Sequence, residues 1–316
     1  MSKVAIVGCG LVGTAWSIVY ARAGHDVRLF DAKPDAAEAA RKSVADSLPA
    51  LADQGLLNGK RPADVLAARL TPAASLAEAV GDADYVQESA PERLEIKRPL
   101  YQEIDKLVSP HAVIGSSTSG FPASSFTADL KCRARCMVVH PLNPPHLIAA
   151  VELVPAPWTA PETFAFAEKL MRAVGQSPIK LTREINGFVV NRLQSAVLAE
   201  AFRLIDDNVC GVADVDAAMT EGLGMRWFFI GPFETIDLNA PEGVAGYCQK
   251  LGPMYEGLAR EQADVRPWSE ALVKKIDAQR RAMVASGSLA ERRSWRDKCL
   301  AAFVTAKRSV IAKFGA

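Results

Sequence analysis

The amino-acid sequence predicts an α/β fold, with a Rossmann-type doubly wound parallel sheet followed by a mainly α-helical C-terminal domain. Two observations lead to this prediction. Short runs rich in Val and Ile alternate with helical stretches over residues 1–184, and this alternation is typical of a parallel sheet with helices on both faces. From residue 185 to residue 316 the apolar spacing is helical throughout. We therefore place a domain boundary between residues 184 and 185.

The individual elements follow from the apolar runs and from the residues that interrupt them. The expected strands are short and bounded by Gly, Asp or Pro, and they cover residues 4–7, 27–30, 85–86, 113–114, 137–139, 151–154 and 179–181. The expected helices of the first domain cover residues 12–23, 36–51, 92–107 and 161–174. In the second domain, apolar residues at helical spacing predict helices over residues 189–205, 215–223, 244–255, 269–283 and 292–311.

Composition and charge exclude several classes of partner. Lys and Arg number 37 and Asp and Glu 36, a net charge of +1, so no strong field is available to hold nucleic acid or an anionic membrane. No apolar run reaches the ~18 residues that span a bilayer. The strand pattern begins at once, which leaves no room for a signal peptide. The cysteines lack the spacing of a zinc site, so we expect no bound metal and reduced thiols in a cytoplasmic protein; they are Cys9, Cys132, Cys136, Cys210, Cys248 and Cys299.

A glycine-rich turn follows the first expected strand directly. The sequence Gly8-Cys9-Gly10-Leu11-Val12-Gly13 joins that strand to the next expected helix, which is the context that the dinucleotide-binding GxGxxG motif requires. Gly8 permits the tight turn, Gly10 lets the backbone approach a pyrophosphate, and Gly13 lets helix and strand pack closely. The backbone N–H groups at the start of the helix, around Leu11 and Val12, would then face the anion.

An acidic residue ends the second expected strand. Asp31 lies eighteen residues after Gly13, close to the spacing at which a carboxylate binds the ribose hydroxyls and repels a 2′-phosphate. We therefore predict NAD rather than NADP as the cofactor, although Lys33 slightly weakens the case against NADP. The alternative is that the glycines make only a structural turn and that Asp31 caps a loop.

Among the four histidines, His140 is the strongest candidate for a catalytic base. It follows the apolar run 137–139, at the carboxyl end of an expected strand, which is the edge where ligands bind in open parallel sheets. An imidazole can take up a proton near neutral pH. Glu152 lies inside the apolar run 149–154, where a carboxylate is costly unless it is paired. The simplest partner is His140, and the pair is either catalytic, with Glu152 fixing the tautomer of His140, or a structural buried ion pair.

Other polar residues at strand ends and helix starts are further candidates. Ser119 belongs to a hydroxyl-rich run that either binds a substrate or the nicotinamide amide, or satisfies its own turn. Glu88 ends another expected strand and could instead cap a helix. Asn191 opens the long helix of the second domain, where its amide either meets a substrate oxygen or bonds across helices. Arg226 either binds a substrate carboxylate in bidentate fashion or forms an ion pair at a domain interface. His146, in a proline-rich loop, is a weaker candidate for a pocket residue.

Motifs along essentially the whole chain resemble the L-3-hydroxyacyl-CoA dehydrogenase family, and within it most closely the lambda-crystallin and L-gulonate 3-dehydrogenase branch. Together they are highly specific for the family and moderately specific for the branch. They are the Gly8 to Gly13 turn, Gln87-Glu88-Ser89-Ala90-Pro91-Glu92, Ser116-Ser117-Thr118-Ser119, His140-Pro141-Leu142-Asn143-Pro144-Pro145, Val151-Glu152-Leu153-Val154-Pro155, Gly187-Phe188-Val189-Val190-Asn191-Arg192, Gly222-Leu223-Gly224-Met225-Arg226, the block from Gly231-Pro232 to Asn239, and Arg292-Arg293-Ser294-Trp295-Arg296-Asp297.

The resemblance implies an NAD-dependent dehydrogenase with four residues around its small-molecule substrate. By analogy His140 is the base, Glu152 orients it, and Ser119 and Asn191 hold the substrate oxygen, while Glu88 lies near the nicotinamide ribose. The resemblance also implies that the first domain binds NAD. The helical second domain would bind substrate and build a homodimer.

The substrate class that the resemblance implies is a free 3-hydroxy acid. Acyl-CoA members typically carry an Asn in the stretch occupied here by Ser116-Ser117-Thr118, and a different loop where Asn143-Pro144-Pro145-His146 stands. Together with the loop that ends at Arg226, these departures favour an acid such as L-gulonate, with Arg226 on its carboxylate, over a thioester such as 3-hydroxybutyryl-CoA. A remote alternative is a non-catalytic, NAD-binding protein of the crystallin kind, but all four site residue types are intact.

Overall fold

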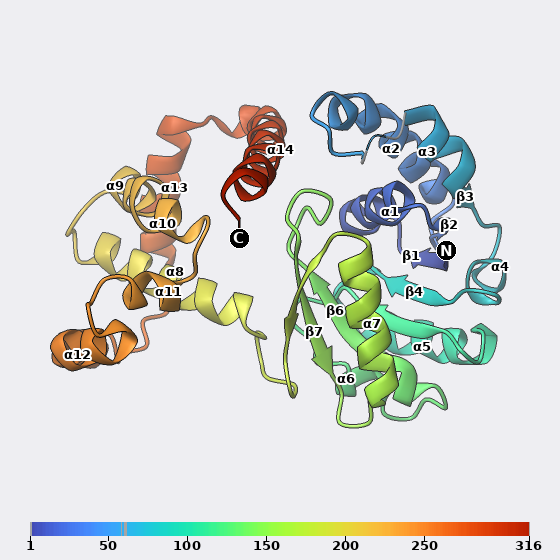
Figure 1. Ribbon diagram of the computed structural model, residues 1–316, viewed down its shortest axis with the longest axis horizontal. Helices are drawn as coiled ribbons and strands as arrows, with labels where there is room; N and C mark the ends of the chain where they lie inside the picture. The colour runs from blue at the N-terminus through green and yellow to red at the C-terminus, as the bar shows by residue number, and fades with distance from the viewer. Residues whose placement is uncertain (1, 58, 60–61, 316) are drawn as a thin grey trace. The chain divides into compact units, whose positions relative to one another are not determined.

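The computed structural model describes residues 2–57, 59 and 62–315, and the chain divides into two compact units (Figure 1). The first unit consists of Met1–Val190 together with Asp297–Ala316, and the second of Asn191–Arg296. This division differs from our expectation of domains at 1–184 and 185–316. The first unit extends to Val190, and the C-terminal segment belongs with it rather than with the second unit.

The first unit is built on an eight-stranded sheet among the residues described. The strand order is β3-β2-β1-β4-β5-β6-β7-β8, and it reverses between β1 and β4, so the carboxyl ends of these two strands form a topological switch point. The strands are β1 (Lys3–Val7), β2 (Asp26–Phe30), β3 (Leu70–Pro72), β4 (Tyr85–Glu88), β5 (Val113–Ser116), β6 (Cys136–Pro141), β7 (Ala150–Pro155) and β8 (Ser177–Lys180).

The sheet is mostly parallel, which confirms the predicted fold class; the one exception among its neighbouring strands is the pair β6–β7, which is antiparallel. Only residues 142–149 join β6 to β7, whereas a parallel crossover needs a dozen residues or more. The chain therefore turns back on itself. The resulting register sets Glu152 directly opposite His140.

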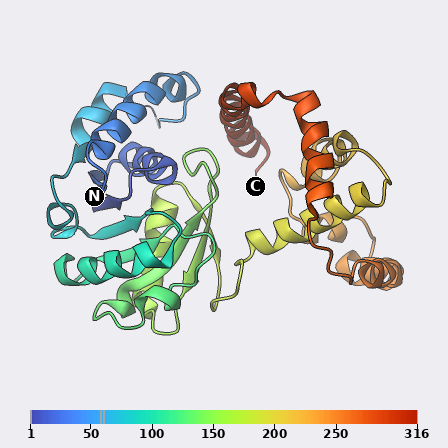
Figure 2. The same ribbon diagram turned by 180° about the vertical axis from the view of Figure 1, so that it is seen from behind.

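Helices cover both faces of this sheet, because successive residues of a strand point to opposite sides. In β1, Val4 and Ile6 belong to one apolar core, and Ala5 and Val7 belong to the other. The first core takes side chains from α1 (Leu11–Ala23), α2 (Ala36–Asp53), α3 (Pro62–Arg69) and α7 (Pro161–Ala173), and the second from α4 (Leu76–Val80), α5 (Leu94–Leu107) and α6 (Ser124–Thr127) (Figure 1, Figure 2). A short 3-10 helix, η1 (Arg133–Arg135), precedes β6.

The C-terminal helix α14 (Leu289–Phe314) begins in the second unit and continues into the first. Ala301 is buried in the first core, and Leu300 and Val304 pack against it. The hydroxyl of Thr305 donates a hydrogen bond of 2.8 Å to the carbonyl of Gln54, just after α2. These contacts explain why the end of the chain belongs with the first unit.

The second unit is helical, as the sequence predicted. Its helices among the residues described are α8 (Val190–Asp206, whose first residue belongs to the first unit), α9 (Val212–Ala217), the π-helix η2 (Ala218–Leu223), α10 (Gly224–Trp227), α11 (Pro232–Asp237), α12 (Gly243–Glu261), α13 (Glu270–Met283) and the 3-10 helix η3 (Ser286–Ser288). Its buried apolar cluster is small and consists of Ile205, Val212 and Leu272. Across the described parts of the chain, no helix combines the length and apolarity that crossing a membrane would require.

Candidate active site

The glycine-rich turn after β1 has the geometry that the motif predicted. Gly8 has φ +99°, in the left-handed region, and a Cβ there would lie 2.6 Å from the carbonyl carbon of Ser89. A Cβ on Gly13 would lie 1.9 Å from the carbonyl oxygen of Gly8, so both positions require glycine. A Cβ on Gly10 would meet no atom within 4 Å. The backbone of the turn is therefore closely packed at Gly8 and Gly13 and open at Gly10, where a pyrophosphate would approach.

The start of α1 offers backbone donors at the same place. Gly10 is the N-cap and makes no side-chain capping hydrogen bond, and the side chain of Leu11, the first helical residue, is 84% exposed. The first N–H groups of a helix have no partner inside it, and here they include those of Leu11 and Val12. The residues present thus fit the diphosphate of a dinucleotide.

Asp31 fastens the glycine-rich turn to the end of β2. One carboxylate oxygen accepts a hydrogen bond from the N–H of Cys9 (2.7 Å), and the other accepts one from the N–H of Lys33 (2.8 Å). Asp31 is only partly buried, and a carboxylate has about four acceptor positions. Capacity therefore remains for the ribose hydroxyls that the sequence assigned to it. Burial, together with the charge of Asp31, raises the pKa of the Cys9 thiol to about 12.

His140 and Glu152 form the pair that the sequence predicted. Nδ1 of His140 lies 2.7 Å from Oε2 of Glu152, across the β6–β7 register. Glu152 is fully buried and His140 nearly so, with the ring of Phe188 5.6 Å from the imidazole ring. Because an ionised carboxylate can only accept, Nδ1 carries the proton and Nε2 is left with its lone pair.

The other oxygen of Glu152 holds the segment that leads out of the first unit. Oε1 accepts hydrogen bonds from the N–H groups of Val189 (2.7 Å) and Val190 (2.9 Å). Burial by itself raises the pKa of Glu152, but the hydrogen bonds from His140, Val190 and Val189 outweigh it, and the net pKa is lowered. Glu152 therefore stays ionised at neutral pH and stabilises a positive charge on His140. Asn191 follows Val190 directly and is the first residue of the second unit.

The loop that carries Ser119 lies at the same edge of the sheet as His140. It follows β5, whose Ser116 pairs with Val138 in β6. The hydroxyl of Ser117 is tied into the interior: Nε2 of Gln87 and Nε1 of Trp16 lie 2.8 Å and 3.2 Å from its Oγ.

Ser119, by contrast, is exposed. Of the hydroxyl-rich run that the sequence singled out, Ser116 and Ser117 serve the packing of the protein. The contact of Ser119 with a substrate stays a prediction.

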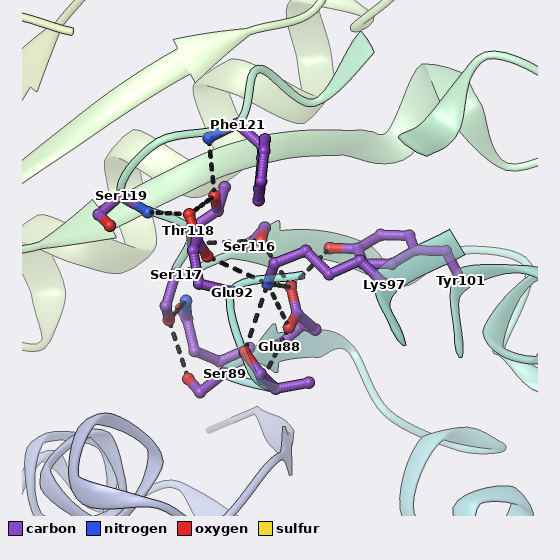
Figure 3. Close-up of polar contacts among 12 residues, drawn as sticks. Glu88, Ser89, Glu92, Lys97, Tyr101, Ser116, Ser117, Thr118, Ser119 and Phe121 are labelled. Carbon is purple, nitrogen blue, oxygen red and sulfur yellow. Dashed lines mark hydrogen bonds and ion pairs between the residues drawn. The ribbon is translucent and has the colours of Figure 1, made fainter. Parts of the chain in front are cut away.

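Glu88 is fully buried, and Figure 3 shows its polar contacts. Its oxygens lie 2.8 Å and 3.1 Å from the ammonium of Lys97, and they also accept hydrogen bonds from Ser116 Oγ (2.5 Å) and Ala90 N (2.7 Å). The carboxylate of Glu88 thus has several partners inside the protein, and its position near the nicotinamide ribose stays a prediction. Glu92, four residues further along the chain in the loop before α5, has the more accessible carboxylate, with a side chain 39% exposed.

The remaining two candidates are Arg226 and His146. Arg226 is exposed on α10, within the second unit. His146 is largely buried, and its carbonyl accepts a 2.7 Å hydrogen bond from Arg22 at the end of α1. Burial and the nearby charge of Arg22 lower the pKa of His146 to about 4, so it is neutral at physiological pH. His146 thus helps to hold the loop 142–149 against α1.

A glycine-rich turn at the switch point and, on β6 of the same sheet, a histidine paired with a buried carboxylate fit one class of protein: the NAD-dependent dehydrogenases that act on a hydroxyl group. The chain belongs to the 3-hydroxyacyl-CoA dehydrogenase family. The NAD-binding domain of that family matches residues 3–185, and its C-terminal domain matches residues 187–284. These matches confirm NAD as the cofactor and the two-part fold that the sequence predicted.

Relatives with names of different kinds align over nearly the whole chain. The lambda-crystallin homolog of Bos taurus is 42% identical over 94% of this chain and 93% of its own length. An L-carnitine dehydrogenase of Pseudomonas aeruginosa is 36% identical over 98% and 95%. A solved structure of a 5-formyl-3-hydroxy-2-methylpyridine 4-carboxylic acid 5-dehydrogenase, described as an NAD+-dependent dismutase, has a TM-score of 0.78 and 26% identity, and the match covers 98% of each chain.

Proposed function

We propose that the protein oxidises the 3-hydroxyl group of a free hydroxy acid of the L-gulonate type to the 3-keto acid, with His140 as the base. The observation that carries this proposal is the buried His140–Glu152 contact of 2.7 Å, which leaves Nε2 of His140 to accept the hydroxyl proton. NAD, when bound, supplies the hydride acceptor. General-base catalysis of this kind contributes on the order of 10²–10⁴-fold.

The chain's own residues then do three things. His140 takes the hydroxyl proton while the hydride leaves the same carbon, and Glu152 stabilises the imidazolium that results. Because the backbone N–H groups of residues 189 and 190 also hold Glu152, the carboxylate needs no rearrangement when the charge appears. Ser119 and Asn191 hold the substrate oxygen.

A free acid, rather than a thioester, is supported by the names of the relatives and by Arg226. Both the lambda-crystallins and the L-carnitine dehydrogenases align over nearly the whole chain, and L-carnitine is itself a free 3-hydroxy acid. Arg226, exposed on α10, offers a planar guanidinium suited to a carboxylate. The acyl-CoA substrate that the family name carries is the second candidate.

A substrate panel tests the proposal. We expect NADH absorbance to rise when the protein and NAD are mixed with L-gulonate, and we would compare L-carnitine, 3-hydroxybutyrate and 3-hydroxybutyryl-CoA at equal concentration. A response confined to the thioester would reverse the order of the two candidates. A response to L-carnitine alone would keep the free-acid class and replace the substrate.

The role of His140 is tested by substitution. We expect His140→Gln to abolish turnover, because an amide cannot accept the proton, and to leave NADH binding near wild type. Fluorescence titration with NADH measures the second quantity. Loss of NADH binding together with turnover would indicate a folding role for His140 and would count against the proposal.

We also propose that two copies of the chain associate through the second unit. Its buried apolar cluster contains only Ile205, Val212 and Leu272, whereas large apolar side chains such as Phe233 (77%) and Leu238 (70%) are exposed. An apolar surface of this kind marks an interaction site, and the homodimer that the family resemblance implies favours a second copy. We further propose a reducing compartment such as the cytoplasm, in keeping with six cysteines present as thiols.

A further inference from the structure

The loop that carries Ser119 is held by a single carboxylate oxygen. Oε1 of Glu92 accepts hydrogen bonds from the hydroxyl of Thr118 (2.5 Å), from the N–H of Gly120 (2.9 Å) and from the N–H of Ser119 (3.1 Å) (Figure 3). Three donors from three consecutive residues thus converge on one atom. Hydrogen bonds to an ionised acceptor are roughly twice as strong as neutral ones, so Glu92 dominates the local conformation.

A buried ammonium fixes Glu92 from the other side. Oε2 of Glu92 lies 3.7 Å from Nζ of Lys97, and Lys97 is completely buried. The same ammonium binds both oxygens of Glu88, which lies at the end of β4. Glu88, Lys97 and Glu92 thus form a charge network of alternating sign that extends from the interior to the surface loop (Figure 3).

Thr118 connects Glu92 to Phe121, at the end of the loop that carries Ser119. Its hydroxyl donates to Glu92 and also accepts a hydrogen bond of 3.0 Å from the N–H of Phe121. Thr118 is buried, whereas Ser119 and Gly120 are exposed. The backbone of Ser119 is therefore fixed on both sides while its side chain faces outward.

We propose that Glu92 is a positioning residue for the reaction, which fixes the backbone of Ser119 so that its hydroxyl meets the substrate oxygen. This inference rests on the role of Ser119 in the proposed function. Nothing in the sequence singled out Glu92, whereas the resemblance implied a place near the cofactor for Glu88. Misplacing a contact group by about 1 Å costs on the order of 10²-fold in rate. We therefore expect the hydrogen bonds of Glu92 to the loop that carries Ser119 to affect the turnover rate more than the stability of the fold.

A double-mutant cycle separates positioning from a general structural effect. Thr118→Val removes one donor to Glu92 while keeping the side-chain shape, and Thr118→Ser keeps the hydroxyl. Each is made alone and together with Ser119→Ala. We expect Thr118→Val to lower kcat/KM by about tenfold or more in the wild-type background, to have little effect beside Ser119→Ala, and to be rescued by Thr118→Ser. NADH affinity, measured by fluorescence, stays at the wild-type value.

The outcomes distinguish this inference from the proposed function. An equal loss in both backgrounds, or a loss of NADH affinity with Thr118→Val, would overturn the positioning role and leave the proposed function standing. Wild-type activity of Ser119→Ala would remove the role of Ser119 and this inference with it, while the effect of His140→Gln still tests the chemistry. Should Thr118→Val not fold, Glu92→Gln in the same cycle tests the same role, because in either orientation its NH2 group would face donors, either the Lys97 ammonium or the donors of residues 118–120.

Discussion

Glu152 is the residue on which most of the site depends, because its two oxygens serve two different partners. One oxygen orients His140, and the other caps the backbone at residues 189 and 190. Both functions require the ionised form, and the lowered pKa of Glu152 reflects this. A carboxyl whose pKa is lower in the folded than in the unfolded chain stabilises the fold above the unfolded value of about 4.3. That stabilisation is lost as the pH falls through the folded value.

We expect Glu152→Gln to destabilise the protein by roughly 1–3 kcal/mol at neutral pH, because an ionised acceptor of three hydrogen bonds is lost. Urea denaturation from pH 7 down to acid pH measures the effect. The difference from wild type should be constant above about pH 5 and shrink below it. Glu162→Gln, at an exposed position, is the matched control. A difference that is independent of pH would show that the charge of Glu152 contributes nothing to stability.

The glycines of the turn give a second prediction at the residue scale. We expect Gly10→Ala to leave the unfolding free energy within about 0.5 kcal/mol of wild type, because its backbone has φ −72° and its surroundings are open. NADH affinity should fall at least tenfold, about 1.4 kcal/mol. Gly13→Ala should instead lower stability by about 2 kcal/mol or more, because the new Cβ would overlap Gly8. Unchanged NADH affinity in Gly10→Ala would contradict a dinucleotide at this turn.

The contacts of Glu92 and Lys97 are a part of the site that was not predicted from the sequence. Lys97 stands in α5 at a position where the apolar spacing of Leu94, Tyr101 and Ile104 predicts a buried side chain. A lysine in a buried stripe requires a partner of opposite charge, and this signal could have located the Glu88–Lys97 pair. The hydrogen bonds of Glu92 to a loop more than twenty residues away carry no such signal, since they depend on the pairing of β4 with β5.

At the scale of the elements, long and strongly patterned segments were predicted well and short ones were not. The expected helices 12–23, 36–51 and 161–174 match α1, α2 and α7 closely. β3, α3 and α4 were not predicted, because they are only three to eight residues long and therefore show too little periodicity. The antiparallel turn from β6 to β7 was also missed, although the short connection between them contained the reason.

The packing of α14 on the first unit was not predicted from the sequence, and it can be tested by substitution. We expect Ala301→Asp to lower the unfolding free energy by about 3 kcal/mol or more, because it places a carboxylate inside the first apolar core. Ala302→Asp, one position along the same helix and exposed, should be close to neutral. Urea denaturation of both variants makes the comparison. Equal stability of the two would mean that α14 does not pack on the first unit.

Across the whole molecule, most of the exposed large apolar residues among those described lie in the second unit. We expect the protein to be a dimer by size-exclusion chromatography with light scattering, and Phe233→Glu combined with Leu238→Glu to yield monomer, because two charges would be buried in the interface. Gln249→Glu, at an exposed polar position on α12, should leave the dimer intact. A wild-type protein that is monomeric at micromolar concentration would refute the association of two copies.

The split composition of the first unit affects the order in which the molecule is made. A ribosome releases residues 1–190 well before α14, because the whole second unit is translated between them. Until then the apolar surface that receives Ala301, Leu300 and Val304 stays in contact with water or with a chaperone. The first unit is therefore the first to be started and the last to be completed. Translation that stops within residues 191–296 yields a polypeptide in which the apolar surface that receives α14 is uncovered.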